Sequence, residues 1–170
     1  AYGCVDSTAS VQIQVKNIPT ILVVAPTLSA CQGEQVTLSL YPNTNIAGFD
    51  MQWYVNGSAI AGATSTQYSP TDSGSYSLSV TGGSNCTKSS VGKTVIIKPI
   101  PTATYTTSGT TNLCTGDKVT LSANMLPVYT NVNWLKNGTV ITNSPTYKAL
   151  TAGNYQLVVN QNGCRDTSAI

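Results

Sequence analysis

The sequence contains no histidine, and its acidic residues are few and scattered. Without histidine, neither a Ser-His-Asp nor a Cys-His catalytic arrangement can form. There is no C-x-x-C motif for zinc, no closely spaced set of oxygen ligands for calcium and no carboxylate pair. We therefore expect a protein that is not an enzyme and that needs neither a metal nor a cofactor. The acidic residues are Asp6, Glu34, Asp50, Asp72, Asp117 and Asp166.

Charge and long apolar runs are also scarce. Charged residues make up 8% of the chain, against about 25% in an average domain. The net charge is +2 and no cluster of Lys and Arg exists, so we expect no binding to nucleic acid. The longest apolar run, residues 21–25, is far shorter than the roughly 18 residues of a membrane span, so no membrane insertion is expected. No segment has a helical apolar period.

What the chain does contain is a repeat. Residues 31–39 (CQGEQVTLS) return as residues 114–122 (CTGDKVTLS), an offset of 83 residues (114 − 31). Residues 74–80 (GSYSLSV) return as residues 153–159 (GNYQLVV), an offset of 79 residues (153 − 74). The order of the motifs is kept and the offset changes only between them, which is typical of tandem domains whose loops differ in length.

The repeat also predicts the domain boundaries. Cys4 aligns with Cys86 and begins a segment that matches the end of the first repeat, so we expect residues 1–18 to be the last strand of a preceding repeat. Residues 19–99 then form the first domain, and residues 100–170 form a second domain whose C-terminal strand is truncated. The alternative is a divergent N-terminal arm that belongs to no earlier repeat. The linker contains Pro99 and Pro101, which predicts an elongated rod with its hinge at Ile100-Pro101.

Each repeat reads as an immunoglobulin-like layout of antiparallel strands. Residues 36–40 and 119–123 alternate between apolar and polar side chains, and Asn-Gly pairs at 56–57 and 137–138 predict tight hairpins. The fold class expected is all-β, as tandem immunoglobulin-like antiparallel β-sandwiches. Two aromatic positions recur and are interpreted as core: a tryptophan on strand C and a tyrosine corner at the start of strand F. These residues are Trp53, Trp134, Tyr76 and Tyr155.

These motifs resemble a known family. Each repeat is similar to the bacterial immunoglobulin-like repeats of Bacteroidota surface proteins. The shared pattern is C-x-G-x-x-V-T-L, then a strand-C tryptophan, then G-x-Y-x-L-x-V, and finally an Asn-Cys or Gly-Cys pair. The resemblance implies a segment of a long extracellular adhesin on the cell surface, of the type exported by the type IX system and used in gliding motility or attachment. Its partners would be neighbouring repeats of the same polypeptide, and a surface polysaccharide or another cell-surface protein. The alternative is a glycan- or protein-binding accessory module of a secreted hydrolase.

The chain has five cysteines, and they lie at positions that recur with the repeat. This pattern indicates disulfides and an oxidising compartment. Pairing Cys31 with Cys86 and Cys114 with Cys164 is favoured because each unit then contains a complete pair, with Cys4 bonded outside the fragment. Geometry offers a second possibility. In a strict immunoglobulin topology the A–B and F–G turns lie at opposite ends of the sandwich, and a bond from Cys31 to Cys164 would then staple the two domains together.

The remaining motifs are weaker. Asp6-Ser7-Thr8 resembles the short O-glycosylation motif of Bacteroidota, which makes Ser7 a candidate for modification. Glu34 and Asp117 recur at one position and are interpreted as residues of a solvated turn rather than as calcium ligands. Sequons at Asn56, Asn85 and Asn137 match N-glycosylation sites, but we interpret them as turns. Tyr41, Tyr54, Tyr105 and Tyr129 do not repeat in register and are available for contact with a partner, although nothing groups them.

Overall fold

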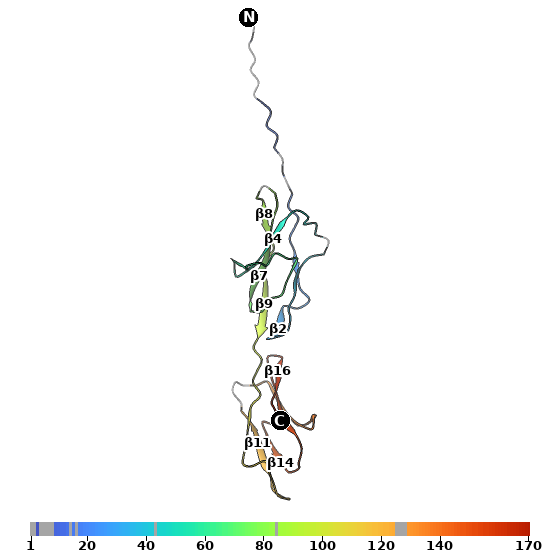
Figure 1. Cartoon of the computed structure of the whole chain (residues 1–170), viewed down its shortest axis with the longest axis vertical. Helices are drawn as coiled ribbons and strands as arrows, with labels where there is room; N and C mark the ends of the chain where they lie inside the picture. Colours follow the sequence, from blue (N-terminus) through green and yellow to red (C-terminus); the bar gives the residue numbers. More distant parts are fainter. Residues whose placement is uncertain are drawn as a thin grey trace.

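The computed structural model describes residues 3, 9–13, 15, 17–42, 44–83, 85–124 and 129–170. Within these ranges all regular structure is β-strand, and the strands form two sandwiches that lie end to end, with the N-terminal arm extending from the first (Figure 1). This confirms the expected fold class of tandem immunoglobulin-like β-sandwiches. In the described part of the chain, no helix has the length and apolarity needed to cross a membrane.

The first sandwich contains a three-stranded sheet in the order β1-β3-β6 and a larger sheet in the order β2-β9-β7-β4-β5, with β8 also paired to β7. Strands β1 and β2 come from one segment that crosses between the sheets. Strand β2 pairs in parallel with β9, whereas the other pairs are antiparallel. The strands are β1 (Val23–Val24), β2 (Ser29–Cys31), β3 (Leu38–Leu40), β4 (Asp50–Val55), β5 (Ser58–Ala59), β6 (Gln67–Tyr68), β7 (Gly74–Thr81), β8 (Thr87–Ser89) and β9 (Lys93–Lys98).

The second sandwich repeats this plan with one difference. One sheet has the order β10-β11-β14 and the other has the order β13-β12-β15-β16. Among the described residues of this sandwich, no strands correspond to β2 and β9. The strands are β10 (Tyr105–Thr107), β11 (Val119–Ala123), β12 (Asn131–Lys136), β13 (Thr139–Thr142), β14 (Thr146–Ala149), β15 (Tyr155–Gln161) and β16 (Cys164–Thr167).

Each sandwich has its own apolar core. Trp53 lies fully buried among Leu38, Leu78 and Val80 in the first core. Trp134 occupies the same position in the second core, which also contains Leu121, Leu157 and Val159. Along β3 and the start of β11, buried residues alternate with half-buried ones, as expected for a strand with one face on the core. The burial of these aliphatic and aromatic side chains is the main source of stability for each unit.

The two Asn-Gly pairs form matching hairpin turns. Asn56 and Asn137 each have a φ of 49°, and the glycines that follow have φ values of 84° and 80°. Positive φ at both central positions defines a type I′ turn, which suits the twist of a two-residue hairpin. The asparagine side chains add a contact to the neighbouring strand region, because Asn56 Oδ1 accepts from the Ser75 amide and Asn137 Oδ1 accepts from the Asn154 amide, both at 2.9 Å.

Candidate functional site

A disulfide joins the two sandwiches. Cys31 ends β2, and its partner Cys164 begins β16 in the other sandwich; their Cα atoms lie 5.6 Å apart. Figure 1 shows these two strands meeting where the sandwiches adjoin. Cys164 follows a tight turn in which Asn162 and Gly163 have φ values of 53° and 87°, and its side chain is fully buried. The F–G turn of the second unit therefore carries its cysteine into the joint.

The favoured pairing of the cysteines within each repeat is wrong. A bond from Cys31 to Cys164 excludes both Cys31–Cys86 and Cys114–Cys164. The reason is topological: Cys31 is level with Lys98 at the joint, whereas Cys86 follows the turn at the far end of β7. The eight residues of β7 lie between these two levels, which is about 26 Å at about 3.3 Å per residue. Cys4 lies outside the described residues.

Hydrogen bonds support the disulfide at the joint. The Lys98 side chain reaches across to the second sandwich and donates to the Asn162 carbonyl at 3.0 Å. On the first side, the Gln32 amide donates to the Lys98 carbonyl at 2.8 Å, which holds the turn after Cys31 against the end of β9. Both chain segments that enter the joint are thus tied to each other as well as to the neighbouring unit.

The linker is anchored on the second sandwich. The Ala103 amide donates to Asp166 Oδ2 at 2.7 Å, and the Tyr129 hydroxyl donates to the Thr102 carbonyl at 2.7 Å. Pro101 and Ala103 are buried, whereas Ile100 is exposed. Residues 101–103 therefore belong to the body of the second unit, and the segment free to bend is confined to the few residues before Pro101.

The acidic residue that recurs three positions after Cys31 and after Cys114 has a structural role that the sequence did not reveal. Glu34 Oε2 accepts from the Cys31 amide at 2.8 Å, and the Glu34 amide donates back to the Cys31 carbonyl at 2.9 Å. Asp117 makes the same pair of bonds with Cys114, at 3.2 Å and 3.0 Å. The turn interpretation thus describes their geometry, and the spacing C-x-G-[E/D] is the signal that such a turn presents a cysteine.

Both tyrosines at the start of strand F make the corner hydrogen bond. The Tyr76 hydroxyl donates to the Asp72 carbonyl at 2.9 Å, and the Tyr155 hydroxyl donates to the Thr151 carbonyl at 2.8 Å. The acceptor is a backbone group, so Thr151 replaces Asp72 without loss of the bond. Burial raises the pKa of the Tyr76 hydroxyl above its ordinary value, and the neighbouring Tyr68 adds to the increase.

The two strand-C tryptophans differ in one respect. Trp53 Nε1 donates to the Ser65 carbonyl at 2.8 Å. Trp134 Nε1 is buried and has no hydrogen-bond partner within the described part of the chain. The connection from Trp134 to Tyr147 is two residues shorter than the one from Trp53 to Tyr68, spanning 13 positions (147 − 134) instead of 15 (68 − 53). The shorter loop does not bring a carbonyl to the second indole.

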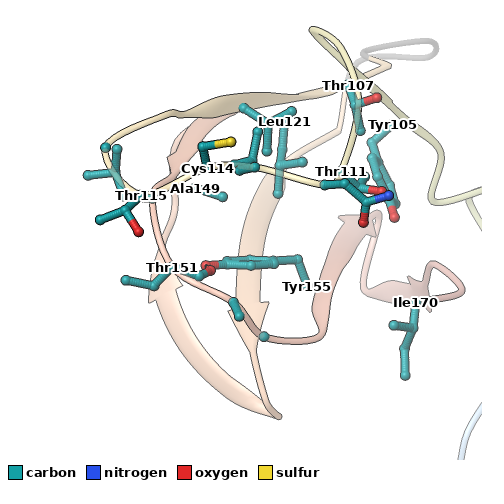
Figure 2. A pocket seen from close by; sticks show the side chains of 17 residues that line it. Tyr105, Thr107, Thr111, Cys114, Thr115, Leu121, Ala149, Thr151, Tyr155 and Ile170 are labelled. Atoms are coloured by element: carbon teal, nitrogen blue, oxygen red, sulfur yellow. The ribbon is translucent and has the colours of Figure 1, made fainter.

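An open cavity of about 940 Å³ lies in the second sandwich. Its walls come from the segment before Cys114 and from β10, β11 and β15, and Figure 2 shows Ile170 at its margin. Apolar side chains line much of it, including Leu113, Leu121 and Tyr155. Elsewhere in the described residues, no three His, Cys, Asp or Glu side chains gather where they could hold a metal ion. Ser7 lies outside the described residues.

Comparison with known proteins places the chain only at the level of fold. No protein-family model matches it, and no curated protein does either. Among solved structures it is similar to fibronectin(III)-like modules of Clostridium thermocellum CbhA, with 12% identity, 86% of this chain and 91% of that chain covered and a TM-score of 0.45. It is also similar to a chain in the complex of a mouse coronavirus receptor-binding domain with its murine receptor (15% identity, 88% and 96% covered, TM-score 0.45).

A third similar structure is SGBP-B of the Bacteroides ovatus mixed-linkage glucan utilization locus, in complex with a mixed-linkage heptasaccharide. Identity there is 14%, coverage is 91% of this chain and 46% of that chain, and the TM-score is 0.39. At these identities and TM-scores the likenesses carry no argument about function. The assignment to the immunoglobulin-like sandwich rests on the strand order of this chain.

Proposed function

We propose that this chain is a non-catalytic, stiff spacer segment of an extracellular surface protein. The observation that supports this function is the Cys31–Cys164 disulfide between the two sandwiches. A single short linker would leave two rigid bodies free to swivel about it. A second covalent connection removes most of this freedom, and the Lys98–Asn162 contact lies beside it. A protein of this kind holds its ends apart, which is what a stalk requires.

The compartment proposed follows from the same bond. Disulfides persist in oxidising surroundings such as the cell exterior and are reduced in the cytosol. The bond joins two sandwiches that each have a separate core, so its effect falls on their relative orientation. We therefore place the protein outside the cell, at the cell surface, with neighbouring repeats of its own polypeptide as its principal partners.

The proposal extends to the domain organisation. Residues 19–99 and 100–170 act as two repeats of an array, and residues 1–18 act as the last strand of a preceding one. Cys114 stands at the position of Cys31 and is held by the same carboxylate turn, but its thiol is free and exposed. In an array, this thiol is placed to clamp the next unit in the way that Cys31 clamps the second.

The finer assignment is an adhesin stalk of the Bacteroidota type, which presents an adhesive tip in gliding or surface attachment. The motifs shared with those repeats support it, and the tip rather than this segment would contact a polysaccharide or another surface protein. An accessory binding module of a secreted hydrolase is the competing assignment. It requires a ligand for the segment itself, so direct binding to glycans distinguishes the two.

Small-angle scattering tests the spacer function. The oxidised monomer should give the profile of a rod approaching twice the roughly 40 Å expected for one sandwich from the rise of its strands. The double variant Cys31→Ser/Cys164→Ser should keep both sandwiches folded but show a broader distribution of distances between them. A compact profile for the oxidised monomer, or identical profiles for the two proteins, would contradict the proposal. Specific binding of this segment to a glycan would favour the accessory module.

A further inference from the structure

The sequence contains three Asn-Gly pairs, and the third one lies at the joint between the sandwiches. Asn56, Asn137 and Asn162 are exposed and have φ values of 49°, 49° and 53°, and the glycine after each also has a positive φ. In an Asn-Gly pair the asparagine side chain can react with the backbone. The glycine has no Cβ, so nothing hinders its amide nitrogen from attacking the asparagine Cγ.

The first two pairs are held by reciprocal hydrogen bonds. Asn56 Oδ1 accepts from the Ser75 amide at 2.9 Å, and the Asn56 amide donates to the Ser75 carbonyl at 2.8 Å. Asn137 makes the same two bonds with Asn154, both at 2.9 Å. The side chain must rotate toward the following amide nitrogen before it can react. The bond to Oδ1 opposes this rotation in both pairs.

The third pair is held differently. Within the described part of the chain, the Asn162 side chain makes no hydrogen bond and the Gly163 amide has no acceptor. The backbone carbonyl of Asn162, by contrast, accepts a hydrogen bond from Lys98 Nζ at 3.0 Å. Lys98 belongs to the other sandwich and is the last residue of β9, which ends at the joint (Figure 1). The third pair thus combines an unbonded side chain with a cation on its peptide group.

The contact with Lys98 favours a reaction of this pair. The nucleophile is the Gly163 nitrogen after loss of its proton, and amide resonance shares the remaining negative charge with the Asn162 carbonyl oxygen. A cation at hydrogen-bond distance from this oxygen stabilises that charge. The nitrogen then forms a bond to Asn162 Cγ, and the bond from Cγ to the side-chain nitrogen breaks. This nitrogen takes a proton from solvent and leaves as ammonia, so the product is a succinimide ring.

We propose that Asn162 is a site of spontaneous modification that ends in isoaspartate, and that Lys98 of the opposite sandwich promotes it. Water adds to the ring carbon that was the Asn162 main-chain carbonyl, because Lys98 polarises this group. The bond from this carbon to the Gly163 nitrogen then breaks. The chain now continues through the side-chain carbon, and a new carboxylate lies where Lys98 already donates. This inference goes beyond the spacer function, since it assigns a modification site.

The modification changes the joint in two ways. It adds one backbone carbon to the two-residue hairpin between Gln161 and Cys164, which are paired across the turn. It also replaces a neutral carbonyl with a carboxylate, so the hydrogen bond from Lys98 becomes an ion pair between the sandwiches. Cys164 stays bonded to Cys31, so the longer turn must fit the same joint. The joint of an aged molecule therefore differs in geometry and charge from that of a new one.

Peptide mapping of the oxidised full-length chain after incubation in heavy-oxygen water tests the proposal. Incorporated heavy oxygen marks each hydrolysed succinimide, and an isoaspartyl methyltransferase identifies the product. The peptide that contains Asn162 should acquire the label about fivefold faster than those that contain Asn56 or Asn137, since a hydrogen bond restrains each of the other two side chains. In denaturant with the disulfide reduced, the three rates should converge, because each site is then an unfolded Asn-Gly pair.

Substitutions of lysine test the role of the cation. Lys98→Gln keeps a hydrogen-bond donor without the charge and should slow labelling at Asn162 about fivefold. Lys98→Arg should retain the rate. The matched control Lys93→Gln removes a charge from the other end of β9 and should also retain it. The same digests check that the Cys31–Cys164 bond is present in each variant. Equal labelling of the three folded sites, equal effects of Lys98→Gln and Lys93→Gln, or aspartate as the main product would each overturn the proposal.

Discussion

The Cα atoms of Cys31 and Cys164 lie 5.6 Å apart, although 133 residues separate them in the sequence. The bond closes a covalent ring that contains the linker and nearly all of both cores. When either sandwich unfolds, the disulfide therefore still restricts the conformations of the unfolded chain. The joint between the units is therefore coupled to the stability of each.

Removal of the ring should destabilise the protein while leaving its fold intact. In the chain-entropy model, a loop of this length contributes about 5 kcal/mol, because the disulfide restricts the unfolded chain. We expect Cys31→Ser/Cys164→Ser to melt at a markedly lower temperature than the oxidised protein in calorimetry. Cys114→Ser is the control and should leave the melting temperature unchanged. A non-reducing peptide map that joins Cys31 to Cys86 would contradict the assigned bond.

The tyrosine corner of the first sandwich should make its stability depend on alkaline pH. At neutral pH, Tyr76→Phe should cost about 1 kcal/mol through loss of the hydrogen bond to the Asp72 carbonyl. Burial raises the pKa of the folded-state hydroxyl above its ordinary value of 10.0, so the neutral form is stabilised. This contribution is complete below pH 10 and is lost as the pH rises through the folded-state pKa.

Denaturant unfolding at pH 8 and pH 11 checks this sign. The difference in unfolding free energy between the unaltered protein and Tyr76→Phe should shrink at the higher pH. Only the unaltered protein has the Tyr76 hydroxyl, and ionisation of this hydroxyl is easier in the unfolded chain than in the folded one. The comparison removes the background from the other tyrosines, which titrate in both proteins. A difference that grows with pH would show that the folded environment favours the ionised form.

The two core tryptophans should respond unequally to the same substitution. Trp53→Phe removes the donor to the Ser65 carbonyl, whereas Trp134→Phe removes an indole N–H that has no partner among the described residues. We expect Trp53→Phe to cost more, by about 1 kcal/mol, because it loses a hydrogen bond, whereas Trp134→Phe removes a buried N–H that has no partner to lose. Hydrogen exchange in β7 and β15 reports the two sandwiches separately. Equal costs would show that the second indole is satisfied in solution.

Cys114 should be the reactive thiol of the second sandwich. It is exposed and unbonded, whereas Cys164 in the same unit is buried in the disulfide. Treatment of the native protein with a maleimide under non-reducing conditions should label the peptide that contains Cys114. The peptides that contain Cys31 and Cys164 should remain unlabelled until a reductant is added. Early labelling of Cys164 would mean that the bond at the joint is not formed.

The fold was accessible from the sequence because local patterns determine it. Alternation at residues 119–123 predicts a strand, and β11 has these bounds. Residues 36–40 predict a longer strand than β3, which begins at Leu38, although Val36 is fully buried and serves the core. Hairpin turns at Asn56-Gly57 and Asn137-Gly138 follow from residue chemistry alone, since both residues tolerate positive φ.

The disulfide was not accessible in the same way. Counting cysteines per repeat treats each unit as closed, and it favoured the wrong pairing. The strict immunoglobulin topology offered the Cys31–Cys164 bond as the second possibility, and the structure confirms that one, with Cys31 at the end of a strand directed at the next unit. The cavity in the second sandwich also depends on three dimensions, because residues about 40 positions apart in the sequence, such as Cys114 and Gly153, line it together.

The bond between Cys31 and Cys164 also sets how the protein bears mechanical load. Tension applied between a point before Cys31 and a point after Cys164 passes through the two sulfur atoms. The polypeptide between the two cysteines then carries no tension. The separation of 133 residues would yield about 450 Å of extra length if that segment were pulled straight. While the disulfide is intact, the residues between Cys31 and Cys164 cannot extend under this force. After reduction, a force large enough to unfold the two sandwiches would release this length.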